Sequence, residues 1–375
     1  MNINRRSFLK RTLAAGSMAV GTGSLLSACS SLRRADLPQQ NFATPVNSQL
    51  DQTGSAILYH AALAPSGHNA QPWFVRIVKK NEWVIGLDSQ RRLPEVDPDN
   101  REALLSIGAF AENLSLAAGT YGYKAEMEVI AGNPFEQDII RVTLNNTGPI
   151  HYHLERLKKR MTVKQGYLPG EIKQADIRAL SEPLKDRLFY FPKGTEHATC
   201  IEEGAIENFR IQVNRDNAQQ ELVRWVRLSN KDAERHRDGL TVAGMEILGF
   251  KGWFVRDFIT PRDFMKPSFR QQSIDITAKL ARQGGGWLII TSEGQTVADL
   301  IETGRRFESM ALTARERNLA IHPMTQYLEE KEGMQQIAAN HATGVVPQFI
   351  LRVGYLINYP DPVSLRRPVS WFVRL

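Results

Sequence analysis

The stretch APSGHNAQPW, residues 64–73, decides how the rest of this chain is interpreted. It favours turns, because Pro65 fixes a backbone angle and Gly67 lets another group approach closely. Ser66 and Asn69 add short hydrogen-bonding side chains that also suit turns. The apolar run that follows, residues 74–78, predicts a strand. The stretch is therefore either a capped loop before a strand or a loop that holds the polar edge of a flat heterocycle.

The same residues resemble a family signature. The pattern Pro-Ser-x-x-Asn-x-Gln-Pro-Trp runs here without a gap, and it resembles the flavin-contacting loop of the nitroreductase superfamily. His68, in front of the Asn, resembles the Acg-like branch of that superfamily. The resemblance implies an FMN-binding protein in which Ser66, Gly67, Asn69 and Gln71 contact the flavin.

Composition and charge exclude several classes of function. The chain has 375 residues, of which 42% are hydrophobic and 23% charged, as is ordinary for a globular protein with one large domain or two. The formal charge is +7, but four of the 47 basic residues and none of the 40 acidic ones lie before Cys29. The near-neutral remainder argues against nucleic-acid binding. With Cys29 modified, Cys200 has no intrachain partner, so neither a disulfide framework nor a metal site is expected.

The N-terminal residues predict export. The run NRRSFLK, residues 4–10, resembles a motif for the twin-arginine export machinery, and residues 12–28 are too short and too polar for a membrane span. The run LSAC, residues 26–29, resembles a lipobox whose Cys29 is lipidated. We expect a signal peptide over residues 1–28, a polar tether over residues 29–52, and a periplasmic or envelope protein held to a membrane by its lipid anchor alone. A plain signal peptide is the alternative.

Helices and strands alternate in the first globular residues. The pattern predicts a helix over residues 55–63, a hairpin of residues 74–78 and 83–87, and strands over residues 125–130 and 139–144. A longer helix is predicted to start within residues 97–102, where Asp99 and Glu102 have capping-box spacing, and to end at Gly122.

This longer helix has a counterpart 196 residues later. The matched positions are Leu104 and Leu300, Gly108 and Gly304, Glu112 and Glu308, and the helix-ending residues Gly122 and Asn318. Apolar periodicity does not explain matched glycines, glutamates and ends, so the pattern indicates an internal duplication. With strands at residues 287–291 and 349–355, the predicted fold is α+β and nitroreductase-like. Two tandem copies, residues 53–150 and 151–375, would form a fused pseudo-dimer.

The resemblance further implies that one copy presents the loop to a phosphate site in the other. The superfamily's Arg-x-Ser-x-Arg/Lys element matches Arg160, Thr162 and Lys164, and arginine suits phosphate because its donors form a fork. The first copy has no Arg or Lys in residues 52–59, so one flavin site per chain is expected. The alternative for this basic run is a solvated helix face.

Two further elements of the superfamily are altered here. Near the C-terminus, Arg366 matches the family's Arg before a Pro, Ser364 replaces its Lys, and Arg367 is the candidate substitute. The acidic-Gly pair that faces the reactive flavin nitrogen falls on Thr325 and Gln326, so a backbone donor survives and a carboxylate does not. No catalytic residue is predicted, because the cofactor supplies the redox chemistry.

These features predict an exported FMN-dependent oxidoreductase that reduces a small organic acceptor in a ping-pong reaction. Two alternatives stay open: a protein that stores or sequesters FMN without turnover, and a degenerate fold with an interaction role. NAD(P)H is not expected outside the cytoplasmic membrane, and the sequence names no other electron donor. The tract of residues 236–253 is either a lid over the flavin or part of a core.

Overall fold

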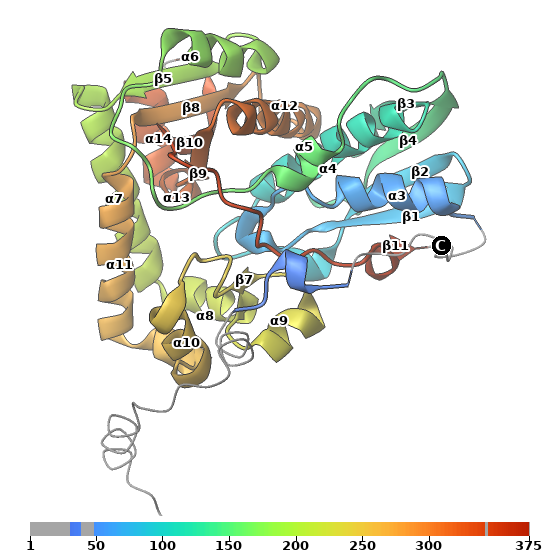
Figure 1. Ribbon diagram of the computed structural model, residues 1–375. Helices are drawn as coiled ribbons and strands as arrows, with labels where there is room; N and C mark the ends of the chain where they lie inside the picture. Colours follow the sequence, from blue (N-terminus) through green and yellow to red (C-terminus); the bar gives the residue numbers. More distant parts are fainter. Residues whose placement is uncertain (1–30, 39–48, 342–343, 375) are drawn as a thin grey trace, which may run out of the picture.

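The computed structural model describes residues 31–38, 49–341 and 344–374. The predicted signal peptide and Cys29 lie outside the described residues. Figure 1 shows two β-sheets with long helices between them and a smaller helical lobe below. In the part of the chain that is described, no helix has the length and apolarity needed to cross a membrane.

The first copy forms the elements that its sequence predicts. They are α3 (Gln52–Ala61), β1 (Trp73–Lys79), β2 (Glu82–Leu87), α4 (Arg101–Thr120), β3 (Tyr123–Val129) and β4 (Asp138–Asn146). The strands pair antiparallel in the order β1-β2-β4-β3. The buried side chains of Trp73, Leu104 and Phe110 join α4 to this sheet in one core.

The second copy repeats this arrangement. It contains β5 (Leu188–Pro192), β8 (Gly286–Ser292), α12 (Val297–Glu316), β9 (Leu319–Pro323) and β10 (Val346–Tyr355). The strand order β5-β8-β10-β9 matches β1-β2-β4-β3 position for position, and all pairs are again antiparallel. Asn318, after α12, has a φ of 56°, the left-handed conformation predicted for the helix end. The predicted α+β fold of two fused copies is confirmed.

The two copies meet where α4 crosses α12, and the duplicated glycines lie at this crossing. A Cβ on Gly108 would stand 2.2 Å from the carbonyl oxygen of Ile301, and one on Gly304 would stand 2.1 Å from that of Leu105. Leu105 and Ile301 are themselves a duplicated pair, so the crossing has approximate two-fold symmetry. Backbones that touch this closely leave no room for any side chain, which is why glycine is matched in both copies.

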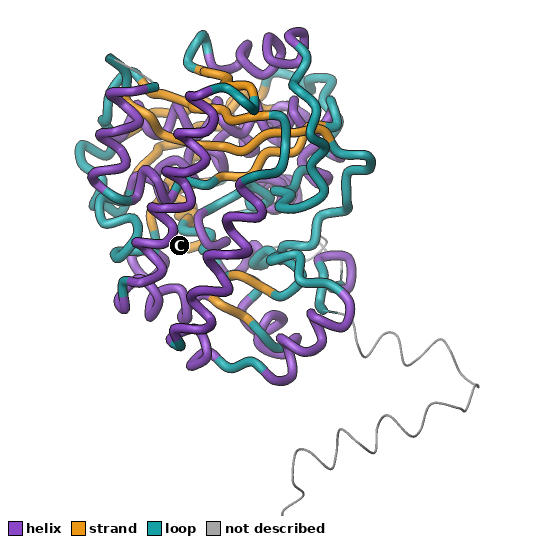
Figure 2. Tube along the Cα trace, turned by 90° about the vertical axis from the view of Figure 1, so that its left-hand side faces the viewer, coloured by secondary structure: helices purple, strands orange, loops and turns teal. Residues whose placement is uncertain are grey.

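The copies differ most between their first two strands. A tight hairpin joins β1 to β2, whereas a long insertion separates β5 from β8. It holds α7 (Glu196–Asn214), α8 (Asp216–Trp225), β6 (Val226–Arg227), α9 (Asn230–His236), β7 (Leu240–Thr241), α10 (Gly249–Phe258), η5 (Pro261–Met265) and α11 (Pro267–Ala281). Figure 2 shows long helices running from the sheets down to the lobe that this insertion builds. The sequence did not predict these helices.

Shorter elements complete the chain. They are η1 (Arg34–Asp36), η2 (Gly67–Asn69), η3 (Ser89–Arg91), α5 (Glu155–Lys159), α6 (Gln174–Ser181), η4 (Glu182–Leu184), α13 (Gln326–Glu329), α14 (Lys331–Asn340), η6 (Val369–Trp371) and β11 (Val373–Arg374). The last of these, β11, pairs in parallel with β1, so the end of the second copy closes the sheet of the first. The division of the chain at residue 150 stays a prediction.

Two local predictions are wrong. The predicted Asp99–Glu102 capping box does not form: the N-cap is Asn100, with a φ of 54°, and the carboxylate of Asp97 accepts from the backbone N–H groups of Glu102 and Ala103 at 3.0 and 2.9 Å. The left-handed turn at Asn100 brings this earlier acid over the helix start. The predicted tether is also not all free chain, because Arg34 docks on the core through the carbonyl oxygen of Ser364.

Candidate cofactor site

A cavity of about 300 Å³ lies at the junction of the two copies. Its lining contains the loop residues Ser66, Gly67 and Asn69 from the first copy, and Arg160, Thr162, Lys164, Thr325, Gln326 and Arg366 from the second. These nine predicted flavin-binding residues come together from four distant parts of the sequence. The volume lies at the small end of the usual range for small-molecule sites.

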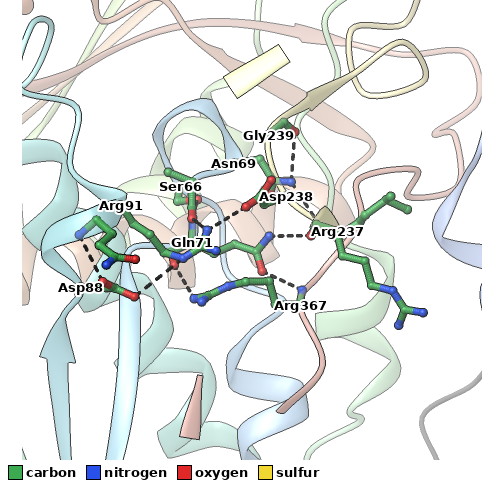
Figure 3. Close-up of polar contacts among 12 residues, drawn as sticks. Ser66, Asn69, Gln71, Asp88, Arg91, Arg237, Asp238, Gly239 and Arg367 are labelled. Atoms are coloured by element: carbon green, nitrogen blue, oxygen red, sulfur yellow. Dashed lines mark hydrogen bonds and ion pairs between the residues drawn. The ribbon is translucent and has the colours of Figure 1, made fainter. Parts of the chain in front are cut away.

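The loop at the cavity is held in an unusual backbone conformation. His68, Asn69 and Gln71 all have positive φ angles, of 49°, 51° and 51°. Residues other than glycine seldom adopt this conformation, which costs of order 1–3 kcal/mol each and is concentrated at functional sites. The Oγ of Ser66 accepts from the backbone N–H of Gln71 at 2.9 Å and closes the loop on itself (Figure 3).

Contacts to the insertion and to the C-terminal tail fix this loop. The Asn69 amide donates to the carbonyl oxygens of Gly239 and Leu365 at 3.2 and 3.3 Å, and its Oδ1 accepts from Arg366 at 3.0 Å. Figure 3 shows the Asn69 side chain directed at Gly239. The three side-chain contacts of Asn69 are thus made to protein, and its predicted contact with a flavin edge remains a prediction.

Two predicted residues do not line the cavity. Gln71 is fully buried, donates to the carbonyl oxygen of Arg237 at 2.9 Å, and accepts from the backbone N–H of Arg367 at the same distance. The guanidinium of Arg367 donates to the carbonyl oxygen of Gln71 at 2.6 Å (Figure 3). It also donates to the carbonyl oxygen of Trp73 at 2.8 Å. These side chains join the loop to the tail, so they position the cavity wall.

One end of the cavity is strongly cationic. The guanidinium groups of Arg34, Arg160 and Arg366 all line it. Within the described part of the chain, the carboxylate that forms an ion pair with this cluster is Glu308, 3.1 Å from Arg160. Carbonyl oxygens of Leu63 and Ala64 hold Arg366 at 3.1 Å, but its buried Nε has no partner among the described residues.

The positive charges of Arg34, Arg160 and Arg366 repel one another. Burial lowers the pKa of Arg366 well below its usual value, and the charges of Arg34 and Arg160 lower it further. Burial and the charge of Arg160 likewise lower the pKa of Arg34 to about 10. Three cations opposite one carboxylate leave roughly two positive charges unmatched, which is the charge of a phosphate monoester with opposite sign. An anion bound here would relieve this repulsion.

Part of the cavity lining is apolar and comes from both copies. Leu105 and Ala109 come from α4, and Phe307 and Phe349 come from α12 and β10. The two phenylalanine rings are stacked with centroids 4.2 Å apart. The buried Oε1 of Gln326 has no partner among the described residues, so this wall offers a free acceptor to a ligand. A flat ring with a polar edge suits such a lining.

The wall beside Thr162 links the second copy to the insertion. Lys164 lines the cavity and donates to the carbonyl oxygen of Gly244 at 3.1 Å, while its backbone N–H donates to Glu246 at 2.7 Å. Burial lowers the pKa of Lys164. Burial and the charges of Arg352 and Lys164 also hold the pKa of His322 well below its usual value, so its imidazole is neutral at pH 7.

Two acids that line the cavity were missed as site residues by the sequence analysis. Glu102 starts α4, Glu329 ends α13, and both line the cavity. Burial raises the pKa of Glu329 well above its usual value, and the charge of Glu102 raises it further. Its Oε1 lies 3.2 Å from the hydroxyl of Thr325. The site therefore has a proton-holding carboxyl where the family pattern at Thr325 and Gln326 offers none.

The sequence analysis also did not predict Arg34 as a site residue, because little in the sequence marks it as one. It lies in a short polar segment, and nothing along the chain relates it to Arg160 or Arg366. The docking of this segment is visible only in three dimensions, where the backbone N–H of Arg34 donates to the carbonyl oxygen of Val363 at 3.2 Å.

The chain is similar in sequence to curated proteins over most of its length. It is 24% identical over 334 residues to PigM of Serratia sp. (strain ATCC 39006), named as an NAD(P)H nitroreductase, with 82% of this chain and 90% of PigM covered. It is 24% identical over 325 residues to acg of Mycobacterium tuberculosis, also named as an NAD(P)H nitroreductase, with 83% and 92% covered. No family model matches the chain. The two similarities support a place in the nitroreductase superfamily.

The similarity of the chain to solved structures is low. A nitroreductase-like family protein from Bacillus cereus covers 61% of this chain and 98% of its own, at 11% identity and a TM-score of 0.34. The FMN-dependent nitroreductase NfnB from Mycobacterium smegmatis covers 59% and 96%, at 12% identity and a TM-score of 0.38. Scores this low support no conclusion about the present chain.

Proposed function

We propose that the protein is an FMN-dependent oxidoreductase of nitroreductase type with one flavin site per chain. The observation that carries this proposal is the unmatched positive charge of Arg34, Arg160 and Arg366 in a cavity whose lining also contains apolar side chains from both copies. A phosphate and a flat ring joined by a short chain match that distribution. The relatives named as nitroreductases support the same reaction class.

The residues present fit such a cofactor. The three arginines would hold the phosphate, because each can offer charge-assisted donors that its backbone partners leave unused. The stacked Phe307 and Phe349, with Leu105, would line the ring and exclude water. A bound flavin would accept electrons from one partner and pass them to a second in ping-pong order.

Two residues of the cavity lining, Glu329 and His322, bear on the protons that this chemistry needs. Glu329, whose pKa burial raises, holds a proton at a pH where exposed carboxyl groups have lost theirs. His322 is neutral and positioned by Arg352, whose Nη2 lies 3.3 Å from its Nδ1. Both groups are uncharged at rest, so the protonated Glu329 can donate a proton to a bound substrate and becomes a carboxylate when it does so.

The test begins with the purified protein. We expect the absorption spectrum of a flavoprotein and, after denaturation, release of FMN. Anaerobic addition of candidate donors, a quinol and NAD(P)H among them, should then bleach the flavin, and a nitroaromatic or quinone acceptor should restore it.

Two results would replace this proposal. A yellow protein that no donor reduces would favour FMN storage without turnover. A colourless protein that binds no added FMN would leave an interaction role for the fold.

For the location, we propose export by the twin-arginine route and a lipid anchor at Cys29. Support comes from the order of the twin arginines, the mildly apolar run and the cysteine in the sequence. This route carries folded proteins, which suits a chain whose cofactor binds between two copies. Metabolic labelling with a fatty acid, lost in Cys29→Ser, tests the anchor.

A further inference from the structure

Helix α10 carries an unusual row of exposed aromatic side chains. Phe250, Phe254 and Phe258 are spaced four residues apart and are 76%, 46% and 55% exposed, and Leu248 just before them is 60% exposed. Side chains at this spacing lie along one face of a helix. We call Leu248 and these three phenylalanines the α10 face. Soluble monomers seldom expose apolar side chains in a contiguous group of this size.

The α10 face is ordered by its own contacts. The ring centroids of Phe254 and Phe258 are 5.3 Å apart, and Trp253 lies 5.1 Å from Phe250 and 5.2 Å from Phe258. The opposite side of the helix is packed, because Val255 and Ile259 contact a buried cluster that includes Leu228 and Phe264. One face of α10 therefore packs against the protein, and the opposite face is exposed.

Basic side chains flank the apolar row. Residues 248–266 contain four basic residues, Lys251, Arg256, Arg262 and Lys266, against two acidic ones. Lys251 lies on the exposed side of the helix, and Arg262 is exposed at the start of η5. Aromatic rings on one face with cations beside them are typical of helices that lie in the headgroup layer of a membrane.

The chain also enters the fold at this lobe. The backbone N–H of Leu32 donates to the side chain of Asn230 at 2.9 Å. Asn230 starts α9, two residues after Leu228, which packs in the same cluster as α10. Cys29 precedes Leu32 by three residues, a length of chain that spans at most roughly 11 Å. In Figure 1, α9 and α10 lie together at the lower end of the molecule.

We propose that the α10 face binds the surface of an anionic lipid bilayer and forms a second membrane contact beside the anchor. Phenylalanine rings enter the boundary between headgroups and acyl chains, while Lys251 and Arg262 stay at the phosphate level. A single acyl chain gives only weak membrane binding, so a second contact of this kind strengthens it.

Only a short segment separates the cavity lining from helix α10. Leu240 and Gly244 line the cavity, and α10 begins five residues after Gly244. Membrane contact through α10 therefore places this wall of the cavity near the lipid surface. The proposed membrane contact adds an interaction surface to the proposed function. Only one supporting observation, the short chain from Cys29 to Leu32, depends on the proposed lipid anchor.

Binding to vesicles tests this directly. The probe is the mature chain, residues 29–375, carrying Cys29→Ser so that no lipid can be attached. We expect it to sediment with vesicles of phosphatidylglycerol and phosphatidylethanolamine, and the fluorescence of Trp253 to shift to shorter wavelength on binding. Changing Phe250, Phe254 and Phe258 together to Ser should weaken binding by at least about tenfold, since three rings lose their transfer into lipid.

Two variants complete the design. Ile357→Ser removes an apolar side chain that is 77% exposed, and it should leave binding unchanged. Ile357 follows Leu356, whose backbone N–H donates to the carbonyl oxygen of Asn318 near the end of α12. Lys251→Glu with Arg262→Glu keeps the rings and should weaken binding to anionic vesicles more than to phosphatidylcholine vesicles.

Three outcomes would overturn the proposal. They are no vesicle binding by the Cys29→Ser chain, equal binding by the triple Ser variant with unchanged melting temperature, and a dimer that the triple variant abolishes. The last would assign the α10 face to a second copy of this chain. The Cys29→Ser background makes each outcome independent of flavin turnover and of lipidation.

Discussion

Single residues determine the charge of the cavity. Arg34, Arg160 and Arg366 come from three separate segments and converge with one paired carboxylate, Glu308. The resemblance to a superfamily pointed to Arg160 and Arg366 because both lie in matched motifs. It could not point to Arg34, because that residue reaches the site only when the segment before the first copy folds back onto the tail.

Arg34→Ala tests the phosphate assignment with little damage to the fold. Among the described residues its guanidinium bonds to carbonyl oxygens and to no carboxylate, so its removal leaves no described carboxylate without its partner. Loss of one charge-assisted contact to phosphate should weaken FMN affinity by roughly 10- to 100-fold. The flavin-free protein should keep or gain thermal stability, because repulsion with Arg160 and Arg366 is relieved.

The control for this variant is Arg282→Ala, an arginine whose side chain is 68% exposed and far along the chain. It should leave FMN affinity unchanged. Equal flavin affinity in Arg34→Ala and the parent, measured by fluorescence quenching, would remove Arg34 from the phosphate site.

At the scale of elements, α4 and α12 hold the molecule together. Their repeated pattern was readable from sequence, because amphipathic periodicity and helix ends are local properties. Their mutual contact at Gly108 and Gly304 was not predicted, because the sequence shows the matched glycines but not the backbone that each one meets. The start of α4 was mispredicted because Asp97 reaches over a left-handed residue, which spacing rules do not include. The helices of the insertion were missed although local signals mark some of their starts, such as the N-cap Thr195 before α7 and Pro267 at the start of α11.

Gly304→Ala tests the crossing of the two helices. The new Cβ would lie 2.1 Å from the carbonyl oxygen of Leu105, so the helices must separate. We expect the free energy of unfolding to fall by about 2–4 kcal/mol. Gly170→Ala is the matched control, since a Cβ there meets nothing within 4 Å. Equal unfolding curves for the two variants would show that α4 and α12 are not in backbone contact.

The stability of the fold is expected to depend on pH through Asp97, which caps the start of α4. Burial, with the charge of Glu102, raises the pKa of Asp97 from 3.8 to about 6. A carboxyl that binds its proton more tightly in the folded state destabilises the fold as pH rises from about 4 to about 6. This shift corresponds to roughly 3 kcal/mol.

Asp97→Asn removes that titration. The stability of the variant relative to the parent should rise by up to roughly 3 kcal/mol between pH 4 and pH 7 in urea unfolding. A relative stability that does not change with pH would contradict the raised pKa.

The whole molecule is asymmetric although its two copies share one strand order. Glu112 and Glu308 are duplicated, but Glu308 pairs with Arg160 of the cation cluster, whereas Glu112 meets Arg305 and Ser309 of α12 at 3.2 and 2.8 Å. The two glutamates thus have different partners at equivalent positions, and the cation cluster lies beside Glu308. The insertion and the C-terminal tail both close over this junction, through Gly239 and Arg366.

Titration of the flavin-free chain with FMN and with riboflavin tests this account most directly. The two ligands share the ring and differ in the phosphate. We expect one FMN bound per chain and riboflavin bound at least about 100-fold more weakly, because the cation cluster then lacks its anion. Equal affinity for the two flavins, two FMN per chain, or no binding of either would contradict it.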